Sequence, residues 1–167
     1  MPQHPYFALA CPNSKGQLLL TPCPGSKGVN LIDSLMELQN AGATVVITLM
    51  TEPEMHINSV ERLPQICEQL DLTWVHMAVE DEGAPNNEFT THWQQVGPKI
   101  HQRLDNNENI VIHCKGGSGR TGILAAQILM ERGAPMQPTI DTIKAVRPNA
   151  FVHAVQVNYM RALQNKL

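Results

Sequence analysis

An uninterrupted run of apolar and β-branched residues, NIVIH at 109–113, ends in a loop almost free of side chains, and a helical pattern follows at once. A second such run, TVVITL at 44–49, likewise contains no alternating polar residues. Strands of this composition are typical of parallel sheets that are covered on both faces. The two segments therefore favour an α/β fold with a buried, mainly parallel sheet.

Shorter runs at 17–21 and 74–79 predict two more strands, so we expect a sheet of about four to five strands flanked by helices. Asn30 is expected to cap the first helix, and Gly133 to end the one at 121–133. Besides residues 121–133, apolar residues at helical spacing predict helices around these stripes: Leu31, Ile32, Leu35 and Leu38; Leu63, Ile66, Cys67 and Leu70; Phe89, Trp93, Val96, Ile100 and Leu104; Ile140, Ile143 and Val146; Val152, Val155, Tyr159 and Leu163.

Length and charge narrow the class of protein further. A chain of 167 residues without repeats or linkers predicts a single domain over 1–167. The net charge of −3 argues against broad nucleic-acid binding, which needs a basic face. No apolar run reaches membrane-spanning length, and the first residues do not resemble a secretory signal, so we expect a cytoplasmic protein.

The four cysteines are far apart in the sequence, and no two of them form a C-x-x-C pair. This spacing predicts neither a zinc site nor a redox couple. In a chain without an export signal we expect free thiols.

The loop after the strand at 109–113 reads CKGGSGR, residues 114–120. Gly116, Gly117 and Gly119 would allow left-handed backbone angles and a close approach to a ligand. A helix N-terminus behind such a loop favours a bound anion, and Arg120 offers a planar fork for two oxygens of a phosphoryl group. Dipole, amides and guanidinium together would favour a thiolate at Cys114, which would lie beneath the anion as a nucleophile.

Three other readings of this loop are weaker. A nucleotide-binding Walker loop would need glycine at the position of Cys114 and lysine at the position of Arg120. A structural glycine turn beside an inert buried cysteine leaves Arg120 unexplained. A sulfur-transfer loop of the rhodanese kind has a different loop length and lacks the Gly-Arg-Thr-Gly run.

The segment HCKGGSGRTG resembles the H-C-x5-R-[ST] signature of the cysteine-dependent protein tyrosine and dual-specificity phosphatases. The surroundings resemble the kinase-associated-phosphatase branch of that superfamily over about residues 15 to 166. Three segments carry this likeness: TPCPGSKG, VEDEGAPNNE and AFVHAVQVNYMRAL. The resemblance implies a phosphatase-type fold with the signature loop between a strand and a helix.

A phosphatase of this kind needs a carboxylic acid opposite the nucleophile, because the leaving oxygen must be protonated. The family register places that acid at Asp81, on the loop after the strand at 74–79. Glu80 and Glu82 remain alternatives, because EDEG departs from the usual spacing. A solvated acidic loop is the structural alternative for all three residues.

The resemblance also assigns supporting roles. Thr121 would hydrogen-bond the thiolate, although a helix cap would explain it as well, and His113 would order the loop from behind or be a core histidine. Gln156 aligns with a glutamine near the active site. Lys115 and Ser118 would point outward and tune substrate choice. The substrate-binding set is thus expected to comprise Lys115, Gly116, Gly117, Ser118, Gly119 and Arg120.

The predicted reaction is hydrolysis of a phosphoprotein through a phosphocysteine intermediate, without a metal or other cofactor. Phosphotyrosine is the expected substrate, with phosphoserine and phosphothreonine, since no tyrosine is placed to wall a deep pocket. A phosphoinositide or small phosphate ester is the alternative substrate class. The alternative from another class is a non-catalytic phosphate-binding module. Oligomeric state and regulation of Cys114 by oxidation are not readable from the sequence.

Overall fold

The computed structural model describes residues 2–167 and contains, within them, one five-stranded sheet. The strand order is β1-β2-β5-β3-β4. β1 is antiparallel to β2, and the remaining neighbours are parallel, which confirms the predicted mainly parallel sheet. The strands are β1 (Phe7–Ala10), β2 (Gln17–Thr21), β3 (Ala43–Thr48), β4 (Thr73–His76) and β5 (Asn109–His113).

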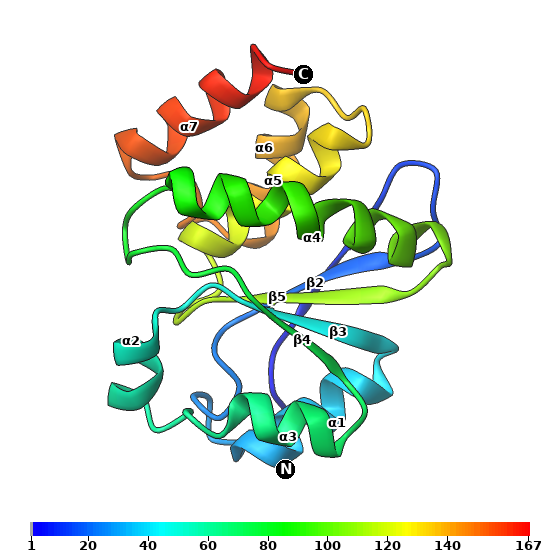
Figure 1. The fold of residues 1–167 in the computed structure, drawn as a ribbon, viewed down its shortest axis with the longest axis vertical. Coiled ribbons are helices and arrows are strands. Elements are labelled where there is room, and N and C mark those ends of the chain that lie inside the picture. The colour runs from blue at the N-terminus through cyan, green and yellow to red at the C-terminus, as the bar shows by residue number, and fades with distance from the viewer. Residues whose placement is uncertain (1) are drawn as a thin grey trace.

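Helices cover both faces of the sheet (Figure 1). α1 and α3 lie on one face, and α4 and α5 lie on the other, with α6 and α7 packed beyond α5. Within residues 2–167, no helix combines the length and apolar character needed to cross a membrane. The helices are α1 (Leu31–Asn40), α2 (Glu52–Ile57), α3 (Leu63–Gln69), α4 (Asn87–Asp105), α5 (Gly119–Glu131), α6 (Met136–Val146) and α7 (Ala154–Gln164).

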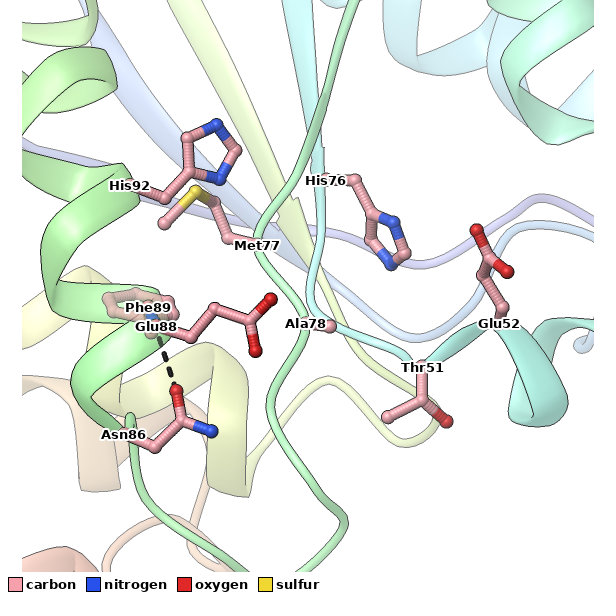
Figure 2. Close-up of a pocket in the computed structure, with 9 residues that line it drawn as sticks. All are labelled: Thr51, Glu52, His76, Met77, Ala78, Asn86, Glu88, Phe89 and His92. Carbon is pink, nitrogen blue, oxygen red and sulfur yellow. Dashed lines mark hydrogen bonds between the residues drawn. The ribbon is translucent and has the colours of Figure 1, made fainter.

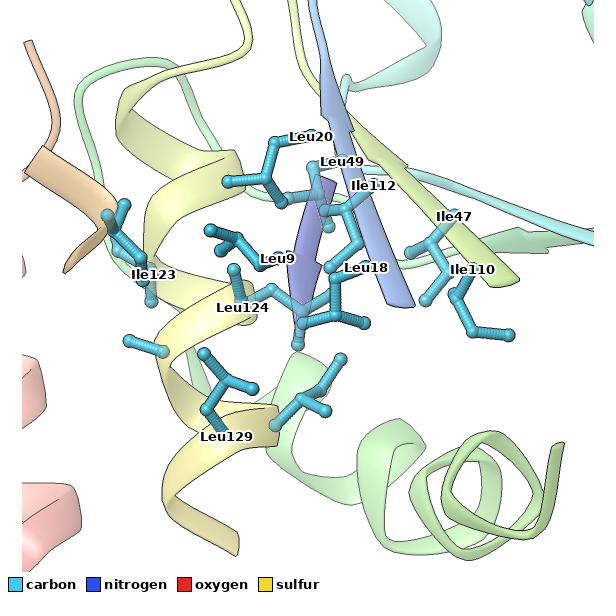
Figure 3. Packing of buried hydrophobic residues seen from close by; sticks show 14 of the residues in the cluster. Leu9, Leu18, Leu20, Ile47, Leu49, Ile110, Ile112, Ile123, Leu124 and Leu129 are labelled. Carbon is cyan, nitrogen blue, oxygen red and sulfur yellow. The ribbon is translucent and has the colours of Figure 1, made fainter. Parts of the chain in front are cut away.

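The uninterrupted apolar strands are explained by the two hydrophobic layers that they separate. In β5, Ile110 and Ile112 pack into the layer under α4 and α5, whereas Val111 packs into the layer under α1 and α3. Successive side chains of a strand point to opposite faces, so a sheet covered on both faces needs apolar residues at every position. Figure 3 shows the first layer, where strand leucines and isoleucines meet Leu124 and Leu129 of α5.

Local signals at the helix ends are confirmed. The side chain of Asn30 accepts a hydrogen bond from the backbone N–H of Asp33 and caps α1. Gly133 follows the last turn of α5 with a φ of +100°, a conformation that glycine adopts without a steric penalty.

The sequence patterns miss two elements and misplace one helix face. β1 is a four-residue edge strand, and α2 is a six-residue helix, both too short for periodicity to reveal. On α7 the predicted stripe through Val152 and Val155 is wrong, because both side chains are exposed and Val152 precedes the helix. The buried face of α7 carries Gln156 and Met160 instead, with Tyr159 and Leu163 at its margin.

Candidate active site

The C-terminal ends of the four parallel strands bring four connecting loops to the same end of the sheet, where ligands of open α/β sheets usually bind. A cavity of about 440 Å³ lies at this end of the sheet. We call residues 114–120 the cysteine loop and residues 80–85 the acidic loop, and both contribute to the cavity. It is lined by Lys27, Asp81, Glu82, Cys114, Gly116, Ser118, Gly119, Arg120, Arg147, Asn149, Val152, His153 and Gln156.

Cys114 lies at the base of the cavity and is nearly buried. Its sulfur accepts a hydrogen bond from the backbone N–H of Gly117 at 3.2 Å and another from Oγ1 of Thr121 at 3.1 Å. Two donors on one sulfur can stabilise negative charge there. The contact predicted for Thr121 is therefore present, and Thr121 lies in the first turn of α5 rather than at its cap, which is Ser118.

Among the loop glycines, only Gly117 has a positive φ, at +75°. A Cβ atom on Gly117 would lie 2.5 Å from the backbone of Thr21 and Pro22, so both conformation and space require glycine here. The left-handed angles expected at Gly116 and Gly119 are wrong. Gly116 faces open space, and Gly119 lies against the side chain of Gln156. At these two positions the missing side chain leaves space beside the backbone, and neither glycine reverses the chain.

A second arginine, which the sequence analysis missed, lines the cavity and binds the backbone of the cysteine loop. Arg147 donates from Nε to the carbonyl oxygen of Gly117 at 3.0 Å and from Nη2 to that of Gly116 at 2.6 Å. Its guanidinium also lies over the ring of Phe7, 4.9 Å from the ring centre. By binding these two carbonyl oxygens, Arg147 holds the peptide groups of Gly116 and Gly117 in place.

Arg120 is buried and is held by three hydrogen bonds to two residues. Nη1 and Nη2 donate to the two carboxylate oxygens of Glu54 at 2.7 and 3.0 Å, and Nη1 also donates to the carbonyl oxygen of Val79 at 2.9 Å. A guanidinium has five donors. Three are used in these hydrogen bonds, which leaves Nε and the second hydrogen of Nη2. Nη2 also lies 3.3 Å from Oδ1 of Asp81, at the rim of the cavity.

Glu54 is the most important residue that the sequence analysis missed. Partial burial alone would raise the pKa of Glu54, but hydrogen bonds from Arg120 and Thr51 outweigh it and hold the pKa below its usual range. Glu54 also forms a capping box with Thr51 at the start of α2. The segment TEPE at 51–54 carries the T-x-x-E signature of that box, which could have located α2 and its carboxylate.

The acidic loop places Asp81 at the rim of the cavity. Its Oδ1 lies 3.3 Å from Nη2 of Arg120, and its side chain is 71% exposed. Glu82 also lines the cavity, whereas Glu80 does not, although its carbonyl oxygen accepts a hydrogen bond from Gly83. Of the three candidate acids, Asp81 is therefore the one that contacts the guanidinium of Arg120.

His113 lies fully buried behind the cysteine loop. Its Nδ1 is 3.2 Å from the carbonyl oxygen of Cys114, and its Nε2 is 2.7 Å from Oγ1 of Thr48, which accepts from Trp74. Because a carbonyl oxygen can only accept, Nδ1 carries the hydrogen and Nε2 accepts from the Thr48 hydroxyl. Burial lowers the pKa of His113 to about 4, so the ring is a neutral structural link.

The remaining predicted residues differ in their contact with the cavity. Gln156 is fully buried, lines the cavity and donates to the carbonyl oxygen of Gly83 at 3.2 Å, which links α7 to the acidic loop. Ser118 lines the cavity and is half-buried. Lys115 is exposed and is not among the lining residues.

The other cysteines are free thiols, like Cys114, and none lines the cavity. Burial raises the pKa of Cys23 and of Cys67 to about 12, which keeps both protonated near neutral pH. Residues 2–167 contain no cluster of three or more His, Cys, Asp and Glu side chains that could hold a metal ion.

Solved structures with this fold were found by comparison. Kinase-associated phosphatase, solved with its catalytic-site cysteine replaced by serine, matches with a TM-score of 0.87 and 22% identity, over 100% of this chain and 97% of that one. Tk-PTP in its active form matches with a TM-score of 0.74 and 21% identity, over 93% of this chain and 99% of the other. The predicted phosphatase-type fold is thus confirmed.

Curated proteins with a similar sequence include cyclin-dependent kinase inhibitor 3 of Rattus norvegicus, 27% identical over 141 residues, 83% of this chain and 65% of the relative. Dual specificity protein phosphatase 15 of Mus musculus is 32% identical over 96 residues, 57% of this chain and 40% of the relative. The chain therefore spans less than two thirds of the length of these relatives.

A family model described as "Polymorphic toxin system, DSP-PTPase phosphatase" matches residues 25–134, which include the acidic loop and the cysteine loop. The match covers well over half of the chain. It agrees with the resemblance to dual-specificity phosphatases, and with the kinase-associated phosphatase among the structural matches. The chain belongs to this DSP-PTPase phosphatase family.

Proposed function

We propose that the protein is a cysteine-dependent phosphoprotein phosphatase, which hydrolyses phosphotyrosine and also phosphoserine and phosphothreonine through a phosphocysteine intermediate. One observation carries this proposal: the sulfur of Cys114 accepts two hydrogen bonds at the base of a cavity that Arg120 and Asp81 both line. We further propose a cytoplasmic location, on the sequence grounds given above.

In the first step, the thiolate of Cys114 attacks the phosphorus atom and the ester bond to the leaving oxygen breaks. The amides of the cysteine loop and the free donors of Arg120 bind the equatorial oxygens, where negative charge must be held in the transition state. Glu54 and Val79 fix the guanidinium, so it needs no rearrangement when the ligand arrives.

Asp81 acts as the general acid that protonates the leaving alcohol or phenol. In the second step its carboxylate takes a proton from water, which attacks phosphorus and releases Cys114. Thr121 stabilises the departing sulfur through its hydroxyl, 3.1 Å away. Gln156 supports the acidic loop through Gly83.

The proposal is tested with purified protein in the presence of a metal chelator. We expect hydrolysis of p-nitrophenyl phosphate and of phosphotyrosine, phosphoserine and phosphothreonine peptides, with inhibition by vanadate. A panel of phosphoinositides assayed in parallel separates the alternative substrate class. Faster turnover of phosphoinositides than of every phosphopeptide would reassign the substrate, and activity that requires an added metal would overturn the mechanism.

A further inference from the structure

β4 forms one edge of the sheet, and half of its backbone groups face away from β3. The N–H groups of Met77 and Val79 donate to Thr48 and Leu49, each at 2.9 Å. In a parallel strand each residue directs its N–H and C=O to the same side, and neighbouring residues alternate. His76, the last residue of β4, therefore presents its backbone donor and acceptor outward, past the edge of the sheet. The backbone of Ala78, two residues beyond β4, forms no hydrogen bond to β3 or to another part of residues 2–167.

Two hollows flank this edge. The first, of about 390 Å³, lies between the end of β4, the first turns of α4 and the start of α2 (Figure 2). The second, of about 500 Å³, lies between Trp74 of β4 and the helices α2 and α3. The first is lined by Thr51, Glu52, His76, Met77, Ala78, Asn86, Glu88, Phe89 and His92, and the second by Glu52, Pro53, Met55, His56, Glu61, Pro64 and Trp74.

The floors of the hollows belong to different faces of the sheet. Met77 and Phe89 are part of the hydrophobic layer under α4, whereas Met55 and Trp74 belong to the layer under α1 and α3. A strand added beside β4 would point successive side chains to these two faces in turn. One set of side chains would thus meet the first hollow, and the alternate set would meet the second.

Carboxylates supply the charge of both hollows. Glu52 borders both of them, Glu88 borders the first and Glu61 the second. Neither lining includes a lysine or an arginine, and the one ion pair that these glutamates form within residues 2–167 is an exposed contact of 3.9 Å between Glu61 and His56. Apolar floors with negative rims are complementary to a segment that carries apolar and basic side chains.

We propose that the β4 edge and its two hollows, which we call the β4 groove, bind an extended basic segment of the phosphoprotein substrate by strand addition. The inference rests on the proposed function and names its substrate class. Backbone hydrogen bonds to His76 and Ala78 would supply affinity, and the hollows would select the side chains, as in other cases of strand addition.

The position of the β4 groove fits a substrate rather than an unrelated partner. The chain runs from Ala78 to Asp81 in three residues, a span of roughly 10 Å in extended chain. A segment paired with β4 would therefore end a few residues from the phosphorylated side chain that reaches Cys114. A second copy of this chain fits poorly, because pairing two β4 edges would bring equal sets of carboxylates together.

Steady-state kinetics on matched phosphotyrosine peptides test the inference. The peptides share length and core sequence, and their flanks alternate leucine with either lysine or glutamate. We expect kcat/KM for the lysine peptide to be roughly tenfold higher, because rim charges contribute individually small terms that add. N-methylation of every second amide in the flank can be placed in either of two registers. In the register whose amides pair with β4, it deletes the donors of those hydrogen bonds and should remove the preference for the lysine peptide over the glutamate peptide.

Variants of the protein separate the contribution of the charged rims from that of the backbone edge. Glu61→Lys and Glu88→Lys should each lower kcat/KM for the lysine peptide roughly three- to tenfold, whereas Asp141→Lys, the same charge change at an exposed position of α6, should leave it unchanged. Ala78→Pro, two residues beyond β4, removes an N–H that forms no hydrogen bond to β3, and proline is tolerated at the edge of a sheet. It should lower turnover of both peptides while hydrolysis of p-nitrophenyl phosphate stays normal.

Binding of the unphosphorylated lysine flank, followed by fluorescence anisotropy, needs no catalysis and so separates this inference from the proposed function. Equal kcat/KM for the lysine and glutamate peptides would overturn the proposal that the β4 groove binds the substrate. It would also be overturned if Glu61→Lys and Glu88→Lys lowered hydrolysis of p-nitrophenyl phosphate as much as hydrolysis of the peptides. Light scattering that shows a dimer of the wild type, lost in Ala78→Pro, would assign the edge to a second copy instead.

Discussion

The cysteine loop and the acidic loop both follow strands of the same parallel sheet, yet they are built in opposite ways. In the cysteine loop the polar groups are bound by protein: the Arg120 side chain is 2% exposed and meets Glu54, while Arg147 binds two loop carbonyls. In the acidic loop the Asp81 side chain is 71% exposed and only rests against Arg120. The groups that we propose to hold charge in place are fixed, and the group that we propose to exchange a proton is open to water.

Removal of the exposed carboxylate tests this difference between the two loops. Asp81→Ala should lower kcat by about 10²- to 10⁴-fold, because the leaving oxygen loses its proton donor. Stability and phosphopeptide binding should change little, since the side chain is exposed. Single-turnover kinetics measure the chemical step, urea unfolding measures stability, and isothermal titration calorimetry measures phosphopeptide binding. Glu80→Gln and Glu82→Gln are matched controls, and a larger loss in either one would move the acid to that position.

The same comparison predicts a different result for the buried cation. Arg120→Lys keeps the charge but loses the planar fork, so kcat/KM should fall by roughly 10²- to 10³-fold. Because the side chain is buried against Glu54 and Val79, this variant should also unfold at lower urea concentration than Asp81→Ala. Equal stability of the two variants would show that the cysteine loop is not the more firmly fixed of the two.

Acid stability reports on the support behind the cysteine loop. The pKa of His113 is about 4 in the fold and 6.5 in the unfolded chain, so the unfolded state binds the proton first. The stability from this neutral ring is present above pH 6.5 and is lost as the pH falls toward 4, a loss on the order of 3 kcal/mol. Urea unfolding at pH 7.5 and pH 5 should show a smaller pH effect in His113→Asn. An unchanged pH effect would contradict the buried neutral ring.

The smallest effect is expected at the residue that joins α2 to the cysteine loop. Glu54→Gln keeps the shape but removes the charge that orients Arg120, and kcat/KM should fall roughly tenfold, the equivalent of one charge-assisted hydrogen bond. Glu52→Gln, on the same helix but without a contact to Arg120, is the control for p-nitrophenyl phosphate hydrolysis. Equal effects of the two substitutions would remove Glu54 from the site.

How much the sequence predicted depends on how far apart the interacting residues lie in it. The cysteine loop is one contiguous segment, so its proposed nucleophile and its arginine could be named from the residues themselves, and the family resemblance added the hydroxyl of Thr121. Glu54 lies 66 residues from Arg120, and Gly117 lies 30 residues from Arg147, so no local pattern joins them. The Glu54–Arg120 contact depends on strand order, which brings the ends of β3 and β5 together. The Gly117–Arg147 contact depends on the packing of α6 against α5.

Secondary structure shows the same division. β2 and β5 were predicted with their observed bounds, because apolar runs between polar residues determine them locally. The apolar face of α7 was misplaced because Gln156, a polar residue, turns inward to reach Gly83 and the cavity. A polar side chain that is buried beside the cavity departs from the apolar pattern that identifies the buried face of a helix.

Replacement of the proposed nucleophile tests the central claim most directly. We expect Cys114→Ser to lower turnover of a phosphotyrosine peptide by at least about 10⁴-fold, while the affinity for that peptide, measured by isothermal titration calorimetry, stays close to wild type. Turnover by the serine variant at a rate near that of the wild type would contradict attack by the Cys114 sulfur.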